Sequence, residues 1–239
     1  MTRPQALRGA WLGLLLCGLL PFAHLCLQAW VSYAGSGVGL GANPVEAVTH
    51  RSGAWALYLL LATLAITPLR RALRLGWLVR FRRLLGLLAF FYACLHVATY
   101  IVDRAYVEAA VDLRSIGADI AKRPYITLGV AAFLPLLPLA ITSTHGMIRR
   151  LGRRWQTLHR AIYASAILGV LHFTWLVKAD LRGPVISATL LLALMAARIV
   201  FWSRELHHTL PRAAHDSDDG DAEKGAPRDS PDAAPHNRR

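Results

Sequence analysis

Long runs of apolar residues, separated by short polar segments, fill most of the first 202 positions of the chain. A helix needs about 20 such residues to cross a hydrocarbon layer ~30 Å thick, and most of the runs approach this length. The pattern predicts an all-α, polytopic membrane protein built as a bundle of six transmembrane helices. The predicted spans cover residues 7–31, 54–69, 84–102, 122–144, 158–178 and 185–202.

The apolar runs also predict where the membrane domain begins and ends. We expect a short N-terminal segment over residues 1–6 and a transmembrane domain over residues 7–203. Residues 204–239 are charged, small and proline-containing, which is typical of a disordered tail. A signal peptide is the alternative for the first run, but that run is long and lacks a small-residue cleavage site, so we interpret it as a span.

Composition supports a membrane protein and argues against a nucleic-acid partner. Of the 239 residues 55% are hydrophobic, and the mean hydropathy is +0.38, too apolar for an ordinary soluble domain. The formal net charge is +13, but the arginines gather beside apolar runs and show no aromatic–basic interleaving. We therefore interpret the charge as a determinant of membrane orientation, with some contribution to binding anionic lipid.

The basic residues lie mostly on one side of the predicted membrane. Six spans place both termini on the same side, and the segments there hold 20 of the 27 lysines and arginines. Because cytoplasmic loops carry the excess of positive charge, both termini are predicted to be cytoplasmic. The other seven basic residues are Arg51, Arg104, Arg114, Lys122, Arg123, Lys178 and Arg182.

Histidines inside the predicted spans are the main candidates for chemistry. Ionisable side chains are costly in a membrane, and neutral imidazole is a common axial ligand of haem iron. His96 follows Arg83 by 13 residues and His172 follows Arg154 by 18, on spans that run in the same direction. Both therefore reach the outer half of the membrane, which predicts a haem between His96 and His172.

His159 predicts a second, inner redox site. It precedes His172 by 13 residues, which turns an ideal helix about 220° beyond whole turns, so the two would face different directions. His145, at the cytoplasmic end of the fourth span, is the candidate for a second ligand beside His159 at this inner site. Arg82 and Arg83 lie at the same depth, where they either anchor the span as positive-inside residues or bind haem propionates or a flavin phosphate.

The three cysteines, and the histidines outside these two candidate sites, suggest structural roles. Cys17, Cys26 and Cys94 fall inside predicted spans without a CxxC pattern, which favours packing. No CxxCH motif occurs, so any haem would be b-type, held by coordination and packing. His50 is expected in an exoplasmic loop before the second span, and His24 near the membrane interface.

Several segments resemble one known family. They are NPVEAVTHRSGAWAL, RRLLGLLAFFYACLH, KRPYITLG, PLAITST, RRLGRRWQTLHR and LHFTWLVKADLR. Together they look like the MsrQ family, formerly YedZ, the haem-binding membrane subunit of the bacterial periplasmic methionine sulfoxide reductase system. This family lies within the wider ferric-reductase-like transmembrane superfamily, and the resemblance covers roughly residues 10–202.

The resemblance implies a b-type cytochrome in the bacterial inner membrane. Such a subunit carries electrons from the quinone pool, or through a flavin, to a periplasmic molybdopterin-containing methionine sulfoxide reductase, on which the sulfoxide is reduced. His96, His159 and His172 match the family's haem-ligand histidines, and the implied cofactors are haem b, one or two per chain, and FMN. No strand–Gly-loop–helix unit follows the last span, so we expect the electrons to come from another molecule.

Three alternatives remain open from the sequence. A stand-alone quinol or metal reductase would deliver electrons to a small acceptor instead of a protein. A non-redox transporter would use the histidines to line a proton or metal path. A simple helical bundle would contain the histidines incidentally. A haem Soret band would favour the electron carrier or the stand-alone reductase over the transporter and the simple helical bundle.

Overall fold

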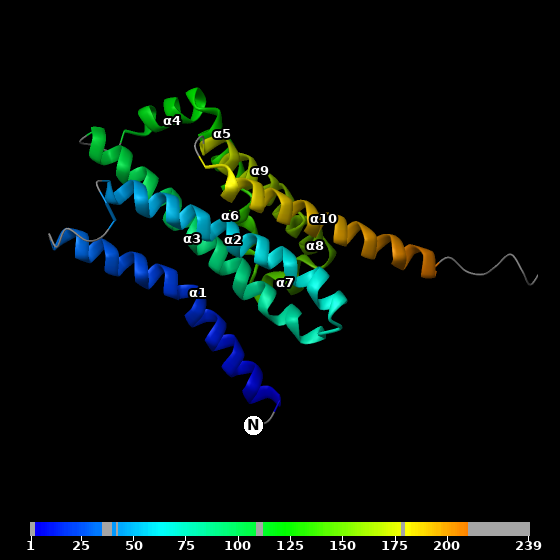
Figure 1. Ribbon diagram of the computed structural model, residues 1–239. Helices are drawn as coiled ribbons and strands as arrows, with labels where there is room; N and C mark the ends of the chain where they lie inside the picture. Colours follow the sequence, from blue (N-terminus) through cyan, green and yellow to red (C-terminus); the bar gives the residue numbers. More distant parts are fainter. Residues whose placement is uncertain (1–2, 35–39, 42, 109–111, 178–179, 210–239) are drawn as a thin grey trace, which may run out of the picture. The chain divides into compact units, whose positions relative to one another are not determined.

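The computed structural model describes residues 3–34, 40–41, 43–108, 112–177 and 180–209, and every regular element within these ranges is a helix (Figure 1). The chain divides into one unit over residues 1–199 and another over residues 200–239. The helices are α1 (Arg3–Tyr33), α2 (Pro44–Ala72), the 3-10 helix η1 (Gly76–Phe81), α3 (Arg82–Glu108), α4 (Leu113–Lys122), α5 (Pro124–Phe133), α6 (Leu136–Ile141), α7 (His145–Leu151), α8 (Arg153–His159), α9 (Ala161–Leu176) and α10 (Arg182–Thr209).

Five helical segments of the described chain are long and apolar enough to cross a membrane. The chain is therefore a multi-pass membrane protein with an all-helical fold. The fifth span expected from sequence is not among them, because α9 has only 16 residues. The five are Gln5–Tyr33, Pro44–Ala72, Gly76–Ala105, Pro124–Ile141 and Arg182–Ser203.

The helix α2 begins ahead of its expected start at Ala54. The side chain of Asn43 accepts a hydrogen bond from the Glu46 backbone N–H (3.2 Å), and Pro44 occupies the first helical turn, so the local sequence starts a helix there. His50 therefore lies in a helix, and its expected position in a loop was wrong. This extension brings the first two turns of α2 against α3.

Pro68 was expected to end the second span, but α2 continues through it to Ala72. Proline has no backbone N–H, so the Leu64 carbonyl lacks its usual helical partner. The Arg198 guanidinium of α10 donates a hydrogen bond to this carbonyl at 2.6 Å, and it also contacts Tyr163 of α9. A basic side chain within α10 thus satisfies the backbone group that Pro68 leaves open and links α10 to α2 and α9.

Two other predicted spans are interrupted. Pro135 and Pro138 were expected to kink the fourth span, and the structure confirms this with separate helices α5 and α6. The fifth span was expected to be one helix, which is wrong because the chain turns at Arg160, whose N–H bonds the Thr157 carbonyl at 3.2 Å. His159 consequently ends α8 and does not share a helix with the residues of α9.

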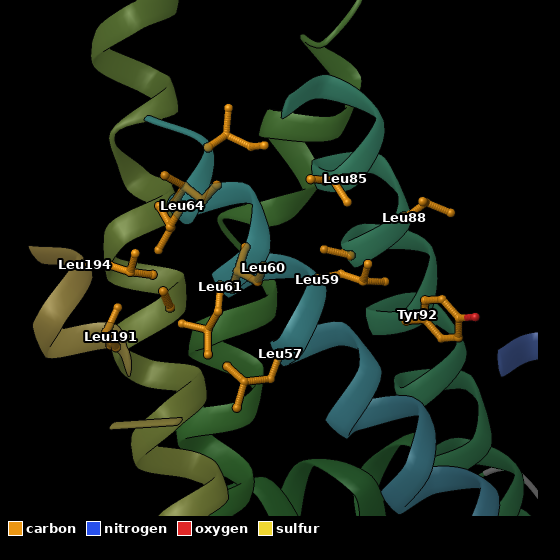
Figure 2. Close-up of a cluster of buried hydrophobic side chains, with 14 of the residues drawn as sticks. Leu57, Leu59, Leu60, Leu61, Leu64, Leu85, Leu88, Tyr92, Leu191 and Leu194 are labelled. Carbon is orange, nitrogen blue, oxygen red and sulfur yellow. The ribbon is translucent and has the colours of Figure 1, made fainter. Parts of the chain in front are cut away.

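Leucines of α2 form the centre of the buried core. α2 packs along α3, and α5 packs along α9. Figure 2 shows Leu61 on the side of Leu191 and Leu194, while Leu59 lies on the side of α3. Because α2 is apolar on more than one face, it can contact α3, α9 and α10 together.

The Tyr92 hydroxyl is inserted into the backbone of α1. It donates a hydrogen bond to the Gly18 carbonyl at 2.8 Å and accepts one from the Phe22 N–H at 2.9 Å, two groups that would pair with each other in a regular helix. Pro21 lies in the same turn, and α1 bends midway along its length in Figure 1. Tyr92 is fully buried, so it joins α1 to α3 through polar groups away from water.

Tyr92→Phe is expected to destabilise the protein by about 1 kcal/mol, because two interhelical hydrogen bonds are lost while the ring still packs. Thermal unfolding of the purified protein in detergent measures the change. Tyr58→Phe is the matched control, since Tyr58 is exposed. Equal stability of both variants and the wild type would contradict a structural role for the hydroxyl.

Candidate functional site

His96 of α3 and His172 of α9 face each other. Their ring centroids are 6.1 Å apart, and the ring planes make an angle of 71°. Both rings are partly buried and line the same cavity. The structure therefore brings together the two histidines that the sequence placed at matching depth on parallel spans.

Each imidazole is held by a backbone carbonyl from a different helix. His96 Nδ1 lies 2.8 Å from the Thr49 carbonyl oxygen of α2, and His172 Nδ1 lies 2.6 Å from the Tyr125 carbonyl oxygen of α5. A carbonyl only accepts hydrogen bonds, so Nδ1 donates its proton in both rings and Nε2 keeps a free lone pair. This is the tautomer in which histidine binds a metal through Nε2, with the other nitrogen fixed by a second group.

The cavity between the two histidines has a volume of about 580 Å³. Apolar side chains from four helices line much of it, among them Leu57, Val97, Phe133 and Phe173. Polar residues gather where α2 begins and α3 ends. These are Asn43, Glu46, His50, Tyr100, Asp103, Arg104, Asp119 and Arg123.

The polar end of the cavity is held by one buried carboxylate of α4. Asp119 binds Arg104 Nε at 3.3 Å and Arg123 Nε at 3.2 Å, and it accepts a hydrogen bond from the Tyr100 hydroxyl at 3.3 Å. Because these partners come from α3 and from the start of α5, the carboxylate fixes α4 beside the cavity. On the α2 side, Glu46 pairs with His50 at 3.6 Å.

The residues around this cavity fit haem. Two imidazoles that bind one iron place their ring centres roughly 6 Å apart, because a metal–nitrogen bond measures about 2.0 Å and the ring centre lies about 1.1 Å further on. The observed separation of 6.1 Å agrees with this requirement. Two Nε2 lone pairs and an apolar lining with one polar end suit a flat, largely apolar group that carries carboxylates.

His159 lines a second, smaller cavity of about 290 Å³, together with Arg82, Arg83 and Trp155. Its Nδ1 lies 3.1 Å from the Trp155 carbonyl oxygen, and its ring stacks on the Trp155 indole with centroids 3.9 Å apart. His159 Nε2 is buried and has no hydrogen-bond partner in the described part of the chain. An orphaned buried nitrogen beside two guanidinium groups marks a place where a ligand can bind.

No second imidazole faces His159 across this cavity within the residues that the structure describes. His145, the partner considered from sequence, is exposed at the start of α7 and does not line the cavity. Arg83 precedes His96 by the same 13 positions that separate His159 from His172. On α3, two arginines, Arg82 and Arg83, line this cavity, and no α3 histidine does.

Sequence analysis did not identify the two carbonyls that orient the imidazoles. A backbone carbonyl leaves no signature in the side-chain pattern, and His50 was missed as a cavity residue because the start of α2 was misplaced. A repeated spacing between each carbonyl residue and its histidine can be recognised only once the structure has identified the carbonyls. Thr49 precedes His96 by 47 residues, and Tyr125 precedes His172 by 47 residues.

Helices that present two carbonyl-held imidazoles to one cavity define a class of membrane protein built to hold haem between transmembrane helices. Residues 52–170 match the family described as ferric reductase like transmembrane component. Among curated relatives, the MsrQ heme-binding subunit of protein-methionine-sulfoxide reductase from Herminiimonas arsenicoxydans is 47% identical over 193 residues, covering 80% of this chain and 84% of the relative.

Two further relatives carry the same name. The protein of Xanthomonas euvesicatoria pv. vesicatoria is 50% identical over 185 residues, covering 76% of this chain and 81% of the relative. The protein of Azospira oryzae is 47% identical over 199 residues, covering 82% and 81%. The chain belongs to the MsrQ family.

Proposed function

We propose that this chain is the b-type cytochrome subunit of a methionine sulfoxide reductase system, with haem bound between His96 Nε2 and His172 Nε2. The observation that carries the proposal is the 6.1 Å separation of two imidazoles whose Nδ1 atoms are both occupied by carbonyls. The relatives named as heme-binding subunits support it.

The bound haem supplies one site that accepts and returns a single electron. His96 and His172 act as nitrogen donors, and the Thr49 and Tyr125 carbonyls fix their tautomer and direction. The apolar lining keeps water from the ring faces, and the polar end receives the carboxylate edge. The chain itself transforms no substrate, and the sulfoxide is reduced on the partner protein.

We also propose a second redox site at His159. The buried Nε2 acts as ligand or hydrogen-bond acceptor, and Arg82 and Arg83 bind the anionic part of the group. Haem propionates and the phosphate of FMN both meet this requirement. The two cavities share Leu60 and Leu136 in their linings, which supports the transfer of electrons from this site to the first haem.

The proposed setting is the bacterial inner membrane, with α9 and the end of α8 as the fifth of six spans and both termini in the cytoplasm. Electrons enter from quinones or a flavin-dependent donor, and leave to a periplasmic molybdopterin-containing reductase. The docking surface is the connector over residues 103–123, which includes α4, together with residues 178–183. Lys178 in the second connector lies outside the described residues, and Arg182 begins α10.

The test uses the full chain in lipid nanodiscs with its haem reduced under anaerobic conditions. Addition of a methionine sulfoxide reductase from a close relative, together with methionine sulfoxide, is expected to reoxidise the haem, and omission of the sulfoxide is expected to stop this after one turnover. Reoxidation by a ferric chelate but not by the reductase would instead favour a stand-alone metal reductase.

A further inference from the structure

Two glycines lie directly against the facing imidazoles. A Cβ atom on Gly53 of α2 would be 2.8 Å from His96 Nδ1, and a Cβ atom on Gly129 of α5 would be 3.0 Å from His172 Nδ1 and Cε1. Real Cβ contacts are almost never shorter than 3.0 Å and are seldom shorter than 3.4 Å. Each ring therefore occupies space that any other residue at these positions would fill.

The two glycines occupy equivalent places. Thr49, whose carbonyl binds His96, lies one helical turn before Gly53. Tyr125, whose carbonyl binds His172, lies one helical turn before Gly129. In both places the carbonyl precedes its histidine by 47 residues. We call each carbonyl with its glycine, Thr49 with Gly53 and Tyr125 with Gly129, a cradle.

Helix packing alone does not explain these glycines. Glycine inside a helix is less favourable than alanine, so an interior glycine needs a local reason. At Gly86 of α3 and Gly169 of α9, an added Cβ would meet its nearest neighbour at 3.7 Å and 3.6 Å, which is ordinary contact. Among the described glycines, only Gly53 and Gly129 have a histidine ring as the nearest neighbour.

We propose that Gly53 and Gly129 are positioning residues that set the reduction potential of the haem between His96 and His172. They let each ring approach the helix closely enough for a strong Nδ1–H···O=C bond. That bond makes the imidazole a better donor, which stabilises ferric more than ferrous iron and lowers the potential. The inference rests on the proposed haem site.

The cradles also fix the angle between the ligands. One carbonyl–glycine pair belongs to α2 and the other to α5, and the two pairs hold the ring planes at 71° to each other. Near-perpendicular imidazoles give a highly anisotropic low-spin ferric EPR signal, whereas near-parallel imidazoles give a rhombic one. The wild-type holoprotein is therefore expected to show the anisotropic signal, and no variant is needed for this observation.

The main test compares Gly53→Ala, Gly129→Ala and the control Gly13→Ala as full-length holoproteins in detergent. Gly13 lies on α1 away from the lining of both cavities, and a Cβ atom there meets nothing within 4 Å. Each of the first two variants is expected to raise the midpoint potential by about 59 mV, which is a tenfold change in the ferric-to-ferrous ratio for one electron. Their EPR signals are expected to shift toward the rhombic type, while Gly13→Ala keeps the wild-type potential and signal. Unchanged potentials in both cradle variants, with haem bound, would overturn the proposal.

A second test adds no methyl group at either glycine and supplies the missing nitrogen donor from solution, so that haem stays bound. In His96→Gly, free imidazole can replace the lost ligand and still donate a hydrogen bond to the Thr49 carbonyl, whereas 1-methylimidazole cannot donate one. Imidazole is expected to bind the haem at least tenfold more tightly than 1-methylimidazole. Equal affinities for imidazole and 1-methylimidazole would overturn the proposed role of the hydrogen bond to the Thr49 carbonyl. A wild-type protein without a Soret band would instead overturn the proposed haem site itself.

Discussion

His172→Ala is expected to abolish binding of the haem between His96 and His172. Haem content then falls at least tenfold if this is the sole haem, and from two per chain to one if His159 binds a second. The variant removes one of the two nitrogen donors and leaves a lone ligand facing an apolar cavity, so the remaining contacts hold haem weakly. His96→Ala is expected to have the same effect, because the two rings lie symmetrically 6.1 Å apart. Haem per chain, measured by the pyridine haemochrome spectrum against protein concentration, gives the result.

The matched control is His24→Ala. His24 is exposed on α1, where it contacts Gln28 at 2.9 Å and is remote in sequence from the residues that line the cavity. The His24→Ala protein should bind haem as the wild type does. A His172→Ala protein with full haem content and an unchanged low-spin spectrum would show that the ligand pair has been assigned wrongly.

His159→Ala is expected to slow electron delivery from quinol to the His96–His172 haem at least tenfold while leaving the spectrum of that haem in place. The variant removes from the second cavity the buried His159 Nε2, whereas His96 and His172 line only the first cavity. Stopped-flow reduction of the haem measures the rate. If the second group is itself a haem, the content per chain should also fall from two to one.

His145→Ala serves as the control for the second cavity. His145 is exposed at the start of α7 and does not line that cavity. In the His145→Ala protein, the rate at which the haem is reduced should match that of the wild type. A wild-type rate in His159→Ala as well would remove the second site from the proposed electron route.

The sequence was sufficient to predict the helical membrane fold and that His96 and His172 come together. Apolar length fixes how many residues can cross the bilayer, and the helical rise fixes the depth of a side chain, so counting from Arg83 and Arg154 was enough to match His96 with His172. Neither step needs knowledge of how the helices pack.

The details that orient the ligands depend on interactions that side-chain patterns do not record. The early start of α2 depends on a cap by Asn43, and the break before α9 depends on a backbone turn at Arg160. The Thr49 carbonyl becomes a ligand-orienting group only because α2 extends beside His96. Such contacts follow from the register of one helix against another, which short-range sequence patterns do not determine.

The most direct test of the central claim is the reduced-minus-oxidised visible spectrum of the wild-type protein, purified in detergent after expression with sufficient haem. The account predicts a six-coordinate, low-spin b-type spectrum with at least one haem per chain. His96→Ala and His172→Ala are expected to remove the contribution of the haem between these two histidines, and His24→Ala is expected to retain it. Absence of a Soret band in the folded wild-type protein would contradict the account and favour a non-redox role for the histidines.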